Sequence, residues 1–169
     1  WECLAAYSEM VSPSTILSSA IGWISPSGIQ ELLEVGLRKD DANTDKDMLL
    51  RSLKIAIDRG AITNSKSGEL IRETLTMLVR LCMKIMDVTA ITKEVRPLHY
   101  AVKKGLNYSC GLDAIIRMDV TALSIKDEET GLFPFMLAAS EPKSCDLETT
   151  MELVRISVMS NRELLPIRS

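Results

Sequence analysis

The fold is predicted from residues 96–105, Arg96-Pro97-Leu98-His99-Tyr100-Ala101-Val102-Lys103-Lys104-Gly105, which indicate a turn followed by a short helix that ends at a glycine. Pro97 suits the first helical position, because its missing N–H costs nothing there and its φ is already helical. Leu98 and Ala101 lie three residues apart and therefore share one face of the helix. The small side chain of Ala101 allows a neighbouring element to approach closely.

Related stretches occur on both sides of this one. Residues Arg51 to Gly60 align with it without a gap, sharing the Arg, Leu, Ala and Gly and replacing the Pro and His by Ser52 and Lys54. A weaker copy follows at residues 133–139, with Phe135 and Ala138 in the places of Leu98 and Ala101 and Met136 in the place of the histidine. These copies predict helices at each of the three positions.

A second duplication gives the period of the chain. Met86-Asp87-Val88-Thr89-Ala90-Ile91-Thr92 recurs as Met118-Asp119-Val120-Thr121-Ala122-Leu123-Ser124, 32 positions later. Each copy directly follows an amphipathic stretch. A turn followed by Pro-Leu-His-x-Ala, with a period near 33 residues, is the signature of the ankyrin unit. The sequence resembles a divergent ankyrin-repeat (ankyrin-like) family, specifically so from about Met86 to Ala139.

The resemblance implies an all-α fold, an ankyrin-like solenoid of about four stacked antiparallel helix pairs with short hairpin or finger loops. The approximate units are 13–47, 48–92, 93–124 and 125–169 within a single domain 1–169, and residues 1–12 would form an N-terminal cap or the end of a preceding unit. The first two units depart furthest from the family and could instead be helical hairpins of a HEAT-like kind. The composition agrees with helices, since 46% of residues are hydrophobic but only 4% aromatic.

Structural roles also follow from the resemblance. His99, the only histidine, would hydrogen-bond backbone near the turn and tie neighbouring units together. A lone histidine without a nucleophile or a ligand set is rarely a catalyst. The residues to which the family motif assigns a structural role are Pro97, Leu98, His99, Ala101, Gly105, Gly131, Pro134 and Ala138.

Loops and helix starts follow from polar runs. Residues 125–131 resemble the Asp-x-x-Gly finger that precedes a helix in the family, and any strand is expected near Ser124 to Gly131. The polar stretch Lys39 to Asp47 is predicted to be an exposed connection of the same kind. A calcium loop there lacks the glycine and the terminal glutamate of the EF-hand pattern.

The helices themselves are predicted from apolar periodicity. They are expected at 16–24, 29–37, 51–60, 67–86 and 96–105, with Leu112, Ile115 and Ile116 facing the core in the helix after Gly111. Asp146 is a good N-cap for a helix from Leu147 to Met159. In that helix the predicted apolar stripe, the face normally turned to the core, consists of Leu147, Met151, Val154 and Val158.

Charge and cysteine content exclude several classes of function. The net charge is -3 with both signs interspersed, so the chain lacks the basic surface of a nucleic-acid-binding protein. No run of about 18 apolar residues is present to span a membrane. Four scattered cysteines and one histidine do not make a zinc set, and they favour a reducing compartment, cytoplasm or nucleus, with an organelle left open. Because the chain begins at Trp1 rather than Met, a fragment is expected.

No motif in the sequence names a reaction, and neither a metal nor a cofactor is expected. Asp127, Glu128 and Glu129 are interpreted as a solvated tip rather than an acid/base pair, which needs a cleft to separate its pKa values. We therefore predict a non-enzymatic scaffold or interaction module that binds a protein partner through the concave face and finger tips of the stack. The predicted partner-binding residues are Asp58, Arg59, Lys103, Lys104, Glu128, Glu129, Ser140 and Glu141. The alternative is a structural or accessory subunit fixed in a larger complex through the apolar ends of the stack.

Overall fold

The computed structural model describes residue 28 and residues 42–62, 68–85, 87, 95–140 and 145–162. These residues form six α-helices and two 3₁₀ helices, without a strand among them, which confirms the predicted all-α class. The elements are α4 (Ala42–Ile62), α5 (Gly68–Ile85), α7 (Pro97–Lys104), η1 (Tyr108–Cys110), α8 (Leu112–Met118), η2 (Val120–Ser124), α9 (Pro134–Ser140) and α10 (Leu147–Arg162).

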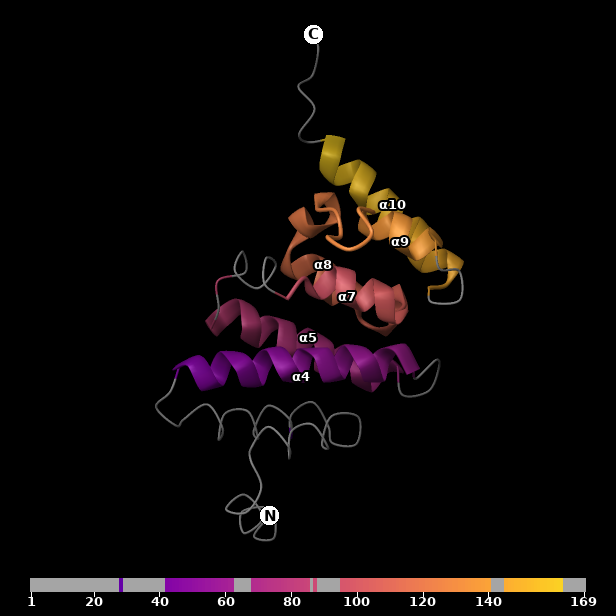
Figure 1. The fold of residues 1–169 in the computed structure, drawn as a ribbon. Helices are drawn as coiled ribbons and strands as arrows, with labels where there is room; N and C mark the ends of the chain where they lie inside the picture. The colour runs from indigo at the N-terminus through magenta and orange to yellow at the C-terminus, as the bar shows by residue number, and fades with distance from the viewer. Residues whose placement is uncertain are drawn as a thin grey trace, which may run out of the picture.

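The helices follow one another through space in chain order (Figure 1). α4 packs along α5, α7 along α8, and α9 along α10. Between these pairs, α4 contacts α7, α5 contacts α8, and α7 contacts α9. The segment between α8 and α9 lies beside α7, which is the helix that carries the Pro-Leu-His motif.

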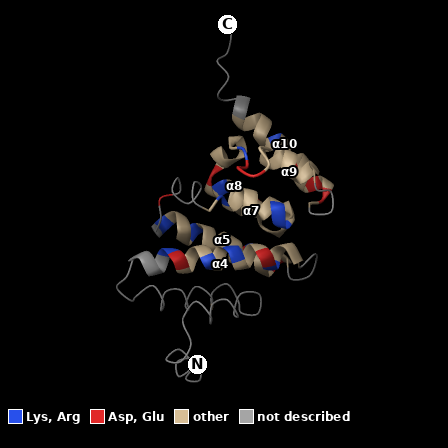
Figure 2. Cartoon of the chain, in the orientation of Figure 1, with Lys and Arg blue, Asp and Glu red and all other residues tan. Residues whose placement is uncertain are grey.

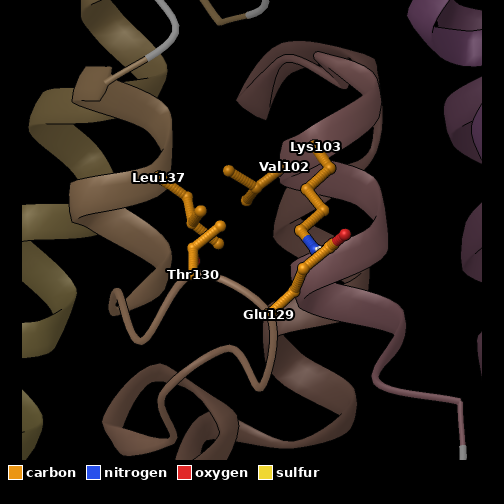
Figure 3. A pocket seen from close by; sticks show the side chains of 5 residues that line it. All are labelled: Val102, Lys103, Glu129, Thr130 and Leu137. Carbon is orange, nitrogen blue, oxygen red and sulfur yellow. Dashed lines mark hydrogen bonds and ion pairs between the residues drawn. The ribbon is translucent and has the colours of Figure 1, made fainter.

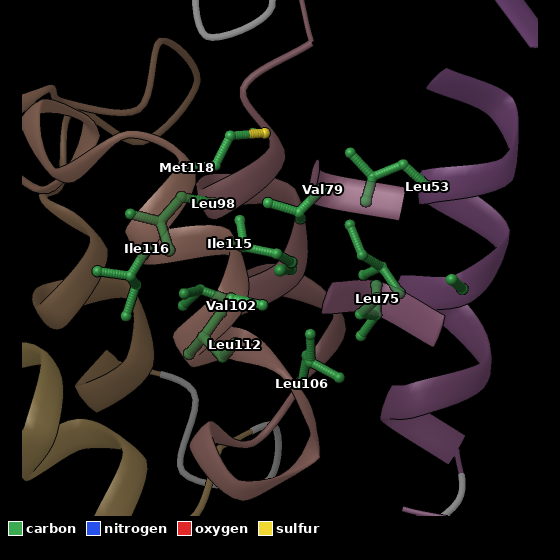
Figure 4. Close-up of a cluster of buried hydrophobic side chains, with 14 of the residues drawn as sticks. Leu53, Leu75, Val79, Leu98, Val102, Leu106, Leu112, Ile115, Ile116 and Met118 are labelled. Atoms are coloured by element: carbon green, nitrogen blue, oxygen red, sulfur yellow. The ribbon is translucent and has the colours of Figure 1, made fainter. Parts of the chain in front are cut away.

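One apolar core runs through the first two of these pairs (Figure 4). Leu53 of α4 and Leu75 of α5 lie on one side of it, and Leu98 of α7 and Ile115 of α8 on the other. Each fully buried leucine or isoleucine contributes about 1.5–3 kcal/mol relative to an exposed one. The largest fully buried side chains are Leu49, Leu53, Ile57, Ile71, Leu75, Leu78, Leu98 and Leu106.

α7 begins and ends where the sequence predicts. Pro97 occupies the first turn, and Gly105 ends the helix in the left-handed region with φ 78°. The N–H of Gly105 donates to the Val102 carbonyl, and the N–H of Leu106 to the Ala101 carbonyl, both at 3.0 Å. This is the Schellman arrangement, in which the residue after the glycine packs back on the helix. Leu106 is fully buried in this position.

The predicted polar connection before α4 is wrong over residues 42–47, which are the first turns of that helix. Met48 and Leu49 are already buried and continue the rows formed by Leu53 and Ile57. Once such a face is packed, each further residue adds one backbone hydrogen bond at little nucleation cost, so the helix extends into the polar residues. The expected unit boundary at 47/48 consequently falls inside a single helix.

The expected orientation of α10 is also wrong. Asp146 caps the helix as predicted, since its carboxylate accepts from the Thr149 N–H at 2.8 Å. The stripe at 147, 151, 154 and 158, however, faces solvent, and the buried positions are Thr149, Leu153 and Ser157. Thr149 turns inward because its hydroxyl oxygen accepts from the Tyr108 N–H at 2.8 Å.

Other helix predictions agree with the structure or lie beyond it. Leu112, Ile115 and Ile116 of α8 are buried as expected. Leu98, Ala101 and Ala138 are buried in the core as expected, whereas Phe135 is only half-buried. The predicted cap 1–12, the helices at 16–24 and 29–37, the repeat copy 86–92 apart from Asp87, and Glu141 lie outside the described residues. None of the described helices is long and apolar enough to cross a membrane.

Three cysteines lie in the described part of the chain, and all are buried. Cys82 lies on α5, Cys110 ends η1 and Cys145 precedes α10. Burial raises the pKa of Cys82 to about 11.

Candidate functional site

The loop between η2 and α9, residues 125–133, is the predicted finger, and Asp127 holds its shape. The Asp127 N–H donates to the Leu132 carbonyl, and the Gly131 N–H donates to the Asp127 carbonyl, both at 2.8 Å. The Asp127 carboxylate accepts from the N–H and the hydroxyl of Thr130 at 3.0 and 2.9 Å. Gly131 has φ 70°, a conformation that other residues adopt only at a cost. The finger is therefore a closed turn.

Asp127 corrects the prediction of a solvated acidic tip. Its side chain is only 7% exposed, whereas those of Glu128 and Glu129 are 80% and 81% exposed. Burial opposes ionisation of Asp127, but hydrogen bonds from Lys103 and Thr130 outweigh it and lower the pKa of Asp127 to about 2. Only the two glutamates behave as the sequence predicts.

Two cations of the α7 segment bind the finger. Lys103 Nζ lies 3.0 Å from Asp127 Oδ2 and 2.7 Å from Glu129 Oε2. Arg96 pairs with Glu128 and donates to the Lys126 carbonyl at 3.1 Å. The bonds to Glu129 and then Asp127 raise the pKa of Lys103, which stays protonated. Figure 2 shows basic (blue) and acidic (red) residues distributed over the helices and loops of the described chain.

These pairs change the interpretation of three predicted partner-binding residues. Lys103, Glu128 and Glu129 are brought together as expected, but their charges are largely satisfied within the chain. Lys103 is one-third exposed and neutralises a buried carboxylate. It is therefore a structural residue as well as a candidate contact for a partner.

His99 holds the first residue of the finger, Ile125, through a hydrogen bond. Its Nε2 lies 2.8 Å from the Ile125 carbonyl oxygen. A carbonyl only accepts, so Nε2 carries the proton and donates. Burial lowers the pKa of His99, which is neutral at pH 7, and its Nδ1 has no hydrogen-bond partner among the described residues. The structure thus contains the backbone hydrogen bond that the family resemblance implies for this histidine.

On the side of α7 that faces α4, Tyr100 links the two helices. Its hydroxyl donates to both carboxylate oxygens of Asp58, at 2.9 and 3.0 Å. Lys104 Nζ lies 3.6 Å from Asp58 Oδ1 and 5.3 Å from the centre of the Tyr100 ring, and Lys54 approaches the same ring at 5.7 Å. Burial and the bond to Asp58 raise the pKa of Tyr100. Asp58 and Lys104 are among the predicted partner-binding residues, whereas the tyrosine that joins them was not predicted from the sequence.

A third tie, also missed, lies between α5 and α8. Asp113 Oδ2 accepts from Arg72 at 3.0 Å and from Arg117 at 3.1 Å. The Asp113 side chain is 5% exposed, and within the part of the chain that the structure describes its other carboxylate oxygen has no hydrogen-bond partner. Arg117 stands four residues after Asp113, a spacing visible in the sequence, whereas Arg72 is distant and carried no signal.

A hollow of about 350 Å³ opens where α7, the finger and α9 meet (Figure 3). Its apolar wall consists of Val102 and Leu137, which are buried. Thr130 and the ion pair of Lys103 with Glu129 form the rest of the lining. The hollow can receive an apolar group that carries a polar or charged atom toward the ion pair.

The remaining predicted residues lie elsewhere. Arg59 is in the last turn of α4. Ser140 ends α9 and donates its hydroxyl to the Leu137 carbonyl at 2.9 Å. Glu141 lies outside the described residues. Among the residues that the structure describes, no three His, Cys, Asp or Glu side chains are grouped so that they could hold a metal ion.

Comparison with known proteins gave no relative: no family model matches the chain, and neither a curated protein nor a solved structure matches it significantly. The family and the function are therefore argued from the residues themselves.

Proposed function

We propose that the chain is a non-enzymatic, ankyrin-like interaction module that binds a protein partner at the finger and at the adjoining hollow. The observation that carries the proposal is the hollow itself, with the apolar pair Val102 and Leu137 beside the charged pair Lys103 and Glu129. Protein interfaces commonly combine an apolar centre with a polar rim. A side chain of a partner would enter the hollow and meet the rim with its polar atoms.

Three local features support the ankyrin-like part of the proposal. Pro97 starts α7, Gly105 ends it with φ 78°, and His99 bonds the backbone of the following finger. All three are implied by the family motif, and they occur together on one helix. The pairwise arrangement of α4 to α10 is compatible with stacked units.

The finger is held in place before any partner binds. Asp127 receives hydrogen bonds from Thr130 and Lys103, and Arg96 and His99 hold the finger at Lys126, Glu128 and Ile125. A surface ordered in advance loses little conformational entropy on association. The geometry thus suits recognition by a rigid face.

The charges of the site favour a protein over a polyanion. Lys103 and Lys104 are paired with Glu129, Asp127 and Asp58. A nucleic acid would have to displace these carboxylates to reach the lysines, and affinity for its backbone depends on free cations. A partner with both signs of charge can instead exchange ion pairs with the rim.

An affinity-capture experiment tests this function. The wild-type chain is compared with Glu129→Lys, which reverses the charge of an 81% exposed rim residue. The control is Glu69→Lys, which makes the same change at an exposed residue of α5. We expect wild type and the control to capture the same protein, identified by mass spectrometry, and Glu129→Lys to lose most of it. Equal capture by all three would refute the proposed surface.

The accessory-subunit alternative has one supporting observation of its own. α10 belongs to the last pair of the described stack and exposes several large apolar side chains. Such a face usually marks an interaction site.

A further inference from the structure

α10 is amphipathic in the opposite sense to an ordinary surface helix. Its inward positions include the polar Thr149 and Ser157 beside Leu153, all buried. Its outward positions are apolar and between 40% and 75% exposed. These outward residues, here called the α10 seam, are Leu147, Met151, Val154 and Val158. The hydrogen bond from the Tyr108 N–H accounts for the inward position of Thr149. No described residue covers the seam.

The spacing of the seam fits another helix. Its residues follow one another at intervals of four, three and four, which is the heptad pattern of a two-helix interface. In an antiparallel pair with twofold symmetry, Leu147 would face Val158 of a second copy, and Met151 would face Val154. Symmetry repeats both layers, so all four seam residues are buried without a gap.

The charges beside the seam distinguish the possible occupants. Glu148 and Arg155 each follow a seam residue directly and therefore lie along the same edge. When the helix is paired with a reversed copy of itself, Glu148 comes beside the second copy's Arg155, about 3 Å away along the axis. The same pair forms again on the other side of the twofold axis. The edge is thus complementary to itself when reversed, as an isologous interface requires.

A parallel pairing lacks this complementarity. Each charged edge would then face the opposite edge of the second copy, where Thr150 and Ser157 are uncharged. Arg155 bonds Glu152 at 2.6 Å within its own helix. Because its side chain is half exposed, a second copy can also reach its guanidinium.

A membrane surface is a poorer occupant. Helices that lie on membranes carry many lysines and arginines on their polar face. α10 has two acidic and two basic residues and no lysine.

We propose that the α10 seam is a homodimer interface in which two copies of the chain pair antiparallel about a twofold axis. This surface shares no residue with the finger or the hollow, so it can fail or succeed independently of the proposed function. The seam covers only about 17 Å of helix, and interfaces this small bind weakly. We expect a concentration-dependent dimer with a Kd on the order of micromolar to tens of micromolar.

Sedimentation equilibrium on the full chain tests the interface. The average mass should rise with concentration from 18.7 kDa toward twice that value. Met151→Lys should raise the Kd at least about tenfold. Met83→Lys, which changes a 48% exposed methionine on α5, should leave it unaltered. Circular dichroism checks that both variants keep their helices.

A charge exchange tests the antiparallel arrangement. Glu148→Arg and Arg155→Glu each convert both cross-pairs into like charges and should raise the Kd roughly tenfold. The double variant restores opposite charges and should return the Kd to near that of wild type. A chain that stays monomeric at every concentration, a dimer indifferent to Met151→Lys, or a double variant no better than the singles would overturn the proposal.

Discussion

Replacing the buried carboxylate of the finger, Asp127→Asn, keeps the shape of the side chain and removes its charge. The pKa of Asp127 falls from the usual 3.8 to about 2 in the folded chain. One pKa unit corresponds to about 1.4 kcal/mol, so the ionised form contributes roughly 2 kcal/mol of stability at pH 7. Because the folded pKa is the lower one, this contribution is complete above about pH 5 and is lost as the pH falls toward 2.

Urea denaturation followed by circular dichroism measures this contribution. At pH 7 we expect Asp127→Asn to lower the free energy of unfolding by about 2 kcal/mol, and the difference from wild type to shrink toward zero near pH 2. Glu128→Gln is the matched control, since its side chain is 80% exposed, and it should change stability by less than about 0.5 kcal/mol. The reasoning would be refuted by equal stabilities at pH 7, or by a difference that does not change with pH.

Two further predictions concern His99 and the glycines. His99→Ala should cost about 1–3 kcal/mol by removing the bond to Ile125. Since burial lowers the pKa of this neutral histidine, wild type should also lose stability below about pH 6.5 more steeply than the variant, as urea titrations at several pH values would show. Gly111→Ala should destabilise more than Gly131→Ala, measured as melting temperature, because a Cβ at Gly111 meets Leu75 at 2.7 Å while Gly131 faces open space. Equal melting temperatures for the two glycine variants would contradict this account.

The parts of the fold that local chemistry determines could be predicted from the sequence. Pro97 and Gly105 mark the ends of α7, and Asp146 caps α10, because each acts on backbone groups within a few residues of itself. Leu112, Ile115 and Ile116 of α8 are also buried as predicted, because residues three and four apart share one face of a helix.

The parts set by distant partners could not be predicted. Asp127 differs from Glu128 and Glu129 in its burial and in its hydrogen bonds from Thr130, so adjacent acids that look alike in sequence have different roles. The Tyr100 hydroxyl donates a hydrogen bond to Asp58, which is 42 positions away in the chain. For α10, periodicity locates the apolar stripe but does not say whether this chain covers it.

Alkylation of the buried cysteines can report where the folded chain opens locally. A buried thiol reacts very slowly with alkylating reagents until its surroundings open, and burial also raises the pKa of Cys82 to about 11. Cys82, Cys110 and Cys145 belong to successive parts of the described chain, so the order in which they are labelled would show which part opens first. The free energies of these local openings can therefore be measured at native cysteines, without substituting any residue.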